Sequence, residues 1–153
     1  MRLRSVALVI GLSLGMTMTL GGPAAAEGRP FSTTLTGGAE VPGPGDPDAS
    51  GTATVTLNQG LGEVCFELSW ANIDGTVFAA HIHEAPTGVA GPVVVPLFVP
   101  PEGPFSGTDS TSGCTAEVDQ ELIKDIRHNP AGFYVNVHST VFPAGAIRGQ
   151  LSK

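Results

Sequence analysis

Hydrophobic and polar residues alternate along several short stretches of this chain, and Gly and Pro lie between those stretches. In residues 51–58, Ala53, Val55 and Leu57 alternate with threonines, which is typical of a strand with one face in the core. Five further stretches have strand character, and Pro96 places one of them at a sheet edge or a bulge. These six predicted strands are residues 51–58, 62–70, 75–84, 91–99, 132–140 and 145–152.

One helix is predicted over residues 116–127, where apolar residues recur at helical spacing. We expect Thr115 to cap its start and Pro130 to follow its end. Two turn-rich segments, residues 41–51 and 100–113, are expected to be loops. About seven short strands and one helix predict an all-β fold, an antiparallel Greek-key β-sandwich or barrel with one short helix.

Two histidines lie two positions apart in one predicted strand, so they share a face of it. The opposite, more apolar face is expected to pack on the core, and it consists of Phe78, Ala80 and Ile82. His81 and His83 then point away from the core. Their Cα atoms are about 7 Å apart on an extended strand, which lets both imidazoles reach one ion.

A second strand repeats this arrangement, since Tyr134, Asn136 and His138 alternate with apolar residues and face outward. Arg148 points outward from the last predicted strand. If these strands are neighbours, a three-nitrogen site suited to copper or zinc is predicted. Its ligands would be His81, His83 and His138, with Tyr134, Asn136 and Arg148 as surrounding or anion-binding groups. The alternative is that the imidazoles only donate and accept hydrogen bonds.

The N-terminal residues 1–26 have the pattern of a secretory signal peptide. Arg2 and Arg4 precede an apolar run, and the small residues 24–26 follow it. We therefore expect a secreted protein with one domain over residues 27–153. After signal cleavage no membrane attachment is expected, because the apolar run is short and interrupted by glycine.

Charge excludes one class of partner. The expected mature chain keeps five basic residues against 14 acidic ones, a net charge of −9. Nucleic acid is therefore not an expected partner, since binding it needs a basic surface. The partner is expected to be an extracellular protein or a small ligand.

Cys65 and Cys114 are the two cysteines of the chain. In an exported protein an even number of cysteines predicts a disulfide, here between these two. Cys65 lies on the polar face of its strand, so the bridge should tie a surface segment to the sheet. Two metal-binding thiolates are the weaker alternative, because the chain has no C-x-x-C pair.

Two separated segments, "AAHIHEAPTGVAGPVVVPLF" and "GFYVNVHSTVFPAGAIRGQL", together resemble the CHRD domain, a module first described in chordin. The matching motifs are H-I-H, G-P-V-V, Y-V-N-V-H and P-x-G-x-I-R-G-Q-L, and the similarity covers most of residues 31–152. The resemblance implies a secreted β-sandwich module without an assigned biochemical activity.

The chain is also similar, more weakly, to copper–zinc superoxide dismutases. In that family an H-V-H strand and a later V-H supply copper ligands, and a late arginine guides the anion. The corresponding positions here are His81, His83, His138 and Arg148. No histidine lies between His83 and His128, so the further ligands of that family's zinc site have no counterpart.

Three functions are compatible with these residues. The favoured one is a non-catalytic extracellular binding module with a copper or zinc site. The second is a copper-dependent, superoxide dismutase-like oxidoreductase. The third is a purely structural or adhesive extracellular module.

Overall fold

Eight strands and one α-helix make up the fold in the computed structural model, which describes residues 30–153. The predicted signal peptide, residues 1–26, lies outside the described residues. The strands are β1 Phe31–Thr36, β2 Ser50–Asn58, β3 Glu63–Ala71, β4 Val77–Glu84, β5 Val93–Phe98, β6 Asp109–Thr115, β7 Phe133–Ser139 and β8 Ile147–Gln150. The helix α1 is Gln120–His128, and short 3₁₀ turns lie at Gly37–Ala39 and Pro130–Gly132.

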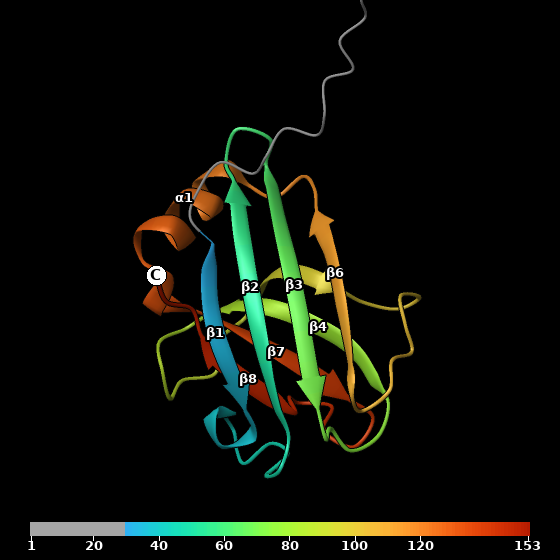
Figure 1. The fold of residues 1–153 in the computed structure, drawn as a ribbon. Coiled ribbons are helices and arrows are strands. Elements are labelled where there is room, and N and C mark those ends of the chain that lie inside the picture. The colour runs from blue at the N-terminus through green and yellow to red at the C-terminus, as the bar shows by residue number, and fades with distance from the viewer. Residues whose placement is uncertain (1–29) are drawn as a thin grey trace, which may run out of the picture.

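The strands form one antiparallel sheet in the order β5-β4-β7-β8-β1-β2-β3-β6. The sheet curls into a nearly closed barrel, in which β1, β2, β3 and β6 form one layer and β4, β7 and β8 cross behind it (Figure 1). β6 lies beside β3 although β4 and β5, which lie between them in the chain, belong to the other layer. This is the Greek-key connection that the sequence predicts.

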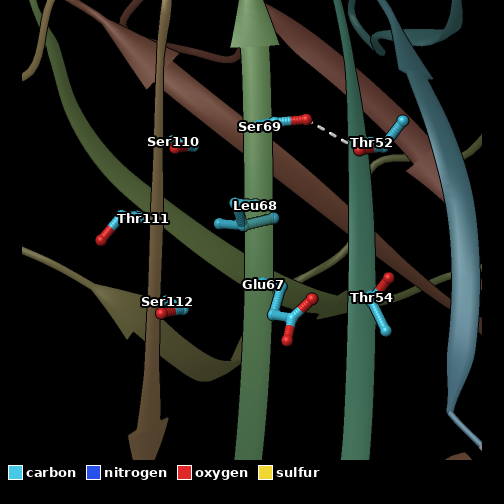
Figure 2. A pocket seen from close by; sticks show the side chains of 8 residues that line it. All are labelled: Thr52, Thr54, Glu67, Leu68, Ser69, Ser110, Thr111 and Ser112. Carbon is cyan, nitrogen blue, oxygen red and sulfur yellow. Dashed lines mark hydrogen bonds between the residues drawn. The ribbon is translucent and has the colours of Figure 1, made fainter.

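The core lies between the two layers and is filled by the inward residues of each strand. Val55 and Leu57 of β2 and Ile82 of β4 are buried there, as alternation predicts. The outer face of β2, β3 and β6 instead carries hydroxyl side chains around Glu67 (Figure 2). On it the hydroxyls of Thr52 and Ser69 are hydrogen bonded across the strands at 2.8 Å.

One prediction about β4 is wrong. Alternation assigns Phe78 to the core, but Val77 is buried in the core and Phe78 is only half-buried. The pairing of β4 with β7 is shifted between Val77 and Ala79, so an irregularity reverses the faces at that point. From Ala80 onward the predicted alternation holds, and the two histidines lie opposite the core face.

Two predicted boundaries are also wrong. The helix begins four residues later than expected, because Asp119 and not Thr115 caps it; the Asp119 carboxylate accepts hydrogen bonds from the backbone of Glu121 and Leu122. The predicted loop at residues 100–113 contains most of β6, which is polar on both faces and therefore shows little alternation of hydrophobicity. The alternation pattern does not predict β1.

The predicted disulfide is present between Cys65 and Cys114. It joins directly opposite positions of β3 and β6, on the outer face of the sheet. Within residues 30–153, α1 is too short and too polar to span a bilayer.

Candidate metal centre

β4 and β7 are hydrogen-bonded neighbours, so the two histidine-bearing strands lie side by side. In their register His81 is opposite Asn136, and His83 is opposite Tyr134. His138 is opposite Ala79, which places it diagonally across from His81. Diagonal pairs on one face of a sheet are within reach of long and aromatic side chains. The backbone pairing alone therefore gathers the three imidazoles.

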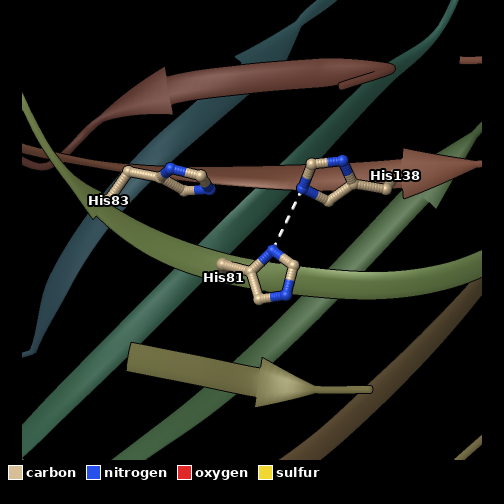
Figure 3. Close-up of side chains that lie close together, drawn as sticks. All are labelled: His81, His83 and His138. Atoms are coloured by element: carbon tan, nitrogen blue, oxygen red, sulfur yellow. Dashed lines mark hydrogen bonds between the residues drawn. The ribbon is translucent and has the colours of Figure 1, made fainter. Parts of the chain in front are cut away.

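The histidine cluster, which we define as His81, His83 and His138, is compact (Figure 3). Nδ1 of His81 lies 3.0 Å from Nε2 of His138. One ring nitrogen from each histidine lies within 4.8 Å of the others. Two nitrogens bound to one copper or zinc ion are about 3.4–4.2 Å apart, so small side-chain movements would bring all three into ligand range.

Backbone carbonyls determine which nitrogens are free to bind. Nδ1 of His83 donates to the carbonyl of Gly91 at 2.9 Å, and Nδ1 of His138 donates to that of Pro143 at 3.1 Å. In the neutral rings each Nε2 then carries a lone pair. Nε2 of His83 is buried and has no hydrogen-bond partner within the described residues. Fixing Nδ1 on a carbonyl is the usual way in which proteins orient a histidine ligand.

The electrostatics keep these rings neutral. Burial, together with repulsion from His138 and His83, lowers the pKa of His81 to about 4. Burial likewise lowers the pKa of His83 and of His138, although their carbonyl partners oppose the shift. Because only neutral imidazole binds a metal ion, these shifts favour ligation at neutral pH.

A strap, residues 85–92, connects β4 to β5 and covers the histidine face. Arg148 holds it by donating to the carbonyl of Val89 at 2.9 Å and to that of Pro86 at 3.1 Å. The hydroxyl of Tyr134 accepts a hydrogen bond from the amide of Gly91 at 3.2 Å. Three side chains of the predicted outward faces are therefore buried, since Tyr134, Asn136 and Arg148 are each at most 3% exposed, whereas His81 is half-buried.

Asn136 and Arg148 occupy different positions relative to the cluster. Oδ1 of Asn136 lies 3.0 Å from Nε2 of His138, in direct contact with the cluster. Arg148 stacks on Tyr134, which in turn stacks on His83. The guanidinium thus reaches the cluster through the Tyr134 ring. Two of its hydrogen bonds go to the strap, and a third, of 3.4 Å, goes to Oε1 of Gln150.

The sequence patterns did not identify three of the surrounding groups. Phe78 lies on the histidine side, with its ring centre 6.2 Å from that of His138, because of the irregularity in β4. Gln150 donates to the carbonyl of Ala85 at 2.8 Å and so holds one end of the strap. The Gly91 carbonyl is a backbone group and has no signal in side-chain patterning. The strap's Gly and Pro residues mark a turn but do not show which face it covers.

The fold and the cluster define a class: an all-β antiparallel barrel that carries three imidazoles on one side of its sheet, under a strap. The family model of the CHRD domain matches residues 31–151, and the chain belongs to this family. Comparison with curated proteins and with solved structures gives no match.

Proposed function

We propose that this protein is a secreted CHRD module that binds one copper or zinc ion through His81, His83 and His138. The observation that carries the proposal is Nε2 of His83, a buried nitrogen that lacks a hydrogen-bond partner and lies beside two further imidazoles. A buried polar atom without a partner costs free energy, which a bound ion would recover.

Secretion is supported by two features. The disulfide between Cys65 and Cys114 is of the kind that persists in oxidising compartments. The N-terminal sequence has the order of a signal peptide, with charged, apolar and small residues in turn.

The donor set favours copper or zinc, because imidazole nitrogen suits both ions. A bound ion would supply Lewis acidity, and in the case of copper also a redox couple. The chain's own part is to hold the ligands, because the carbonyls of Gly91 and Pro143 orient two of the rings. If Nδ1 of neutral His81 binds the ion, the ring proton of His81 would reside on its Nε2, so the contact of 3.0 Å with Nε2 of His138 would be replaced without a net release of protons.

Titration of the full chain with Cu²⁺ and Zn²⁺, followed by calorimetry and metal analysis, tests the proposal. We expect one ion per chain and a loss of affinity of at least about 100-fold in His83→Ala, since that ligand is oriented by a carbonyl. The matched control is His128→Ala, because His128 is an exposed helix-end residue bonded to the Lys124 carbonyl. Equal binding by wild type and His83→Ala would refute the site.

A structural role is the second candidate, and one observation favours it. His83 and His138 already hydrogen bond the strap and the loop at Pro143, so they stabilise these segments without an ion. In that case alanine at His83 or at His138 would lower stability, and no wild-type metal binding would be measured. The two candidates therefore differ in the wild-type titration.

The oxidoreductase alternative has less support from the geometry. Arg148 is 2% exposed, and its donors bind the carbonyls of Pro86 and Val89 instead of facing solvent. An arginine in that position is a poor guide for an incoming anion. Copper-loaded protein is therefore expected to dismutate superoxide no faster than an equal amount of free copper.

A further inference from the structure

The strand β6 is one of the two edges of the sheet, and it pairs with β3 alone. The Cα atoms of Cys65 and Cys114 are 3.9 Å apart. In an antiparallel ladder about 4.5 Å marks a pair without mutual hydrogen bonds and about 5.5 Å a bonded pair, so this is a non-hydrogen-bonded pair. Ser112, opposite Glu67 and two residues away, is of the same type. The backbone groups of Ser112 and Cys114 therefore point away from β3.

These groups face a seam, which we define as the space between the two edge strands β5 and β6. The edges meet where the hydroxyl of Thr115 donates to the carbonyl of Pro96 at 2.5 Å, and no strand pairing joins them. Beside that contact lies a cavity of about 370 Å³. Its lining includes β6 residues and the side chains of Phe66, Leu97, Phe98, Phe105 and Glu102.

The two edges differ in their protection against added strands. β5 contains Pro96, and its pairing with β4 shifts register twice, features that discourage further pairing. β6 has neither proline nor lysine, and its seven pairs with β3 are in continuous register. This strand, along which Ser110, Thr111 and Ser112 lie, is the outermost strand of its layer (Figure 2). β6 thus keeps an edge without strand pairing on the side away from β3, apart from the point where Thr115 contacts Pro96.

We propose that the seam binds an extended peptide segment of a partner protein, which pairs with β6 as an added strand. An edge with free amide and carbonyl groups is complementary to an extended backbone, and alternate side chains of that peptide would enter the cavity, whose lining mixes apolar residues such as Phe98 with polar ones such as Thr111. The segment carries basic residues, because Glu102 is the one ionisable side chain that lines the cavity and the chain has a net charge of −7. A second copy of this chain would bring a second Glu102 and the same negative charge to the seam.

A capped peptide of alternating valine and lysine is the probe, added to the metal-free full chain so that the outcome is independent of the proposed ion. We expect the amides of Ser112 and Cys114 to become protected from hydrogen exchange. Ser112→Pro removes an amide that does not bond β3, and should weaken binding by about tenfold or more. Ser112→Ala, the matched control, should bind as the wild type does.

A second experiment varies the peptide. The same peptide with alternate amides methylated cannot donate to an edge strand, and it should bind at least about tenfold more weakly. Replacing lysine by glutamate in the peptide should also weaken binding, and Glu102→Gln should reduce that difference. Equal binding of methylated and unmethylated peptides overturns the proposal, as does failure of the lysine peptide to bind. Self-association of the chain that Ser112→Pro abolishes would assign the seam to a second copy and also overturn it.

Discussion

The guanidinium carbon of Arg148 lies 3.3 Å from the centre of the Tyr134 ring. That ring also stacks on His83, with 4.8 Å between the ring centres and 12° between the planes. The arginine therefore links the strap to the histidine cluster in two ways. It binds the strap carbonyls directly, and it packs on the aromatic ring that supports His83. Cation–π contact adds to this stacking, and more strongly in a buried site.

Removing the guanidinium in Arg148→Ala leaves the carbonyls of Pro86 and Val89 without these donors, at a cost of roughly 1–3 kcal/mol in stability. The strap would loosen, and with it the Gly91 carbonyl that orients His83, so metal affinity should fall by about tenfold or more. Urea unfolding and a zinc titration measure the two effects.

Arg148→Lys sharpens this test, because lysine keeps the charge but loses the planar group that stacks and binds two carbonyls. We expect it to show most of the loss. The control is Arg127→Ala, at a half-buried position on α1. If Arg148→Ala keeps the stability of the wild type and the same hydrogen-exchange rates of the strap amides, the strap is held by other contacts.

The disulfide closes a long loop, since 49 positions separate Cys65 from Cys114. Constraining a loop of that length in the unfolded chain stabilises the fold by about 4 kcal/mol in the chain-entropy model. The double substitution of Cys65→Ser and Cys114→Ser should lower the free energy of unfolding by this order, measured in urea. Wild type unfolded with a reductant present serves as the comparison. A loss well below 1 kcal/mol in both would contradict the expectation.

Asp119 caps α1 with hydrogen bonds of 2.8 Å and 3.0 Å to the amides of Glu121 and Leu122. Asp119→Ala should therefore cost about 1 kcal/mol. Asp125→Ala, which removes an exposed carboxylate from within the same helix, is the matched control. Thr115→Ala tests the cap expected from the sequence pattern, and it should leave the helix unaffected. Because the Thr115 hydroxyl also bonds the Pro96 carbonyl, the comparison is made by hydrogen exchange of the α1 amides. Faster exchange of these amides in Thr115→Ala than in Asp119→Ala would contradict the observed cap.

Alternation predicts the strands whose two faces differ, such as β2 with Val55 inside and Thr54 outside. It also predicts the inward direction of Ile82 and the opposite direction of His81 and His83. It does not find β6, because a strand of Ser, Thr and Gly has no apolar face to detect. It assigns Phe78 to the wrong face, because a one-residue irregularity reverses the side chains beyond it without changing the composition.

The sequence likewise predicts one part of the candidate site and not the other. Side-chain patterning identifies the members of the histidine cluster. Their proximity depends on the pairing of β4 with β7, which the residues of either strand alone do not determine. The groups that orient the rings are carbonyls of Gly91 and Pro143, and every residue carries a carbonyl. Their selection is a property of the tertiary fold, so the sequence alone could not predict it.

Glu40 is a buried carboxyl whose Oε1 lacks a hydrogen-bond partner within the described residues. Burial raises its pKa from 4.5 to about 7, although attraction by Arg148 and a hydrogen bond from the Val41 amide oppose the shift. Between these values the folded protein keeps a proton that the unfolded chain has lost. Its contribution to stability is therefore complete below about pH 4.5 and is lost as the pH rises through about 7. His81 acts in the opposite direction, since its pKa is lowered from 6.5 to about 4 and its contribution is lost as the pH falls through that range.

Glu40→Gln should remove the Glu40 contribution to this pH dependence. A shift from 4.5 to about 7 corresponds to roughly 3 kcal/mol, so the variant should be more stable than wild type by about that order above pH 7. Near pH 4 the two proteins should unfold alike, because both side chains are then neutral. Urea unfolding at a series of pH values measures this, with Glu84→Gln, at an exposed position, as the control. If Glu40→Gln is instead less stable at neutral pH, the folded protein keeps Glu40 ionised, and its attraction to Arg148 outweighs the cost of burial.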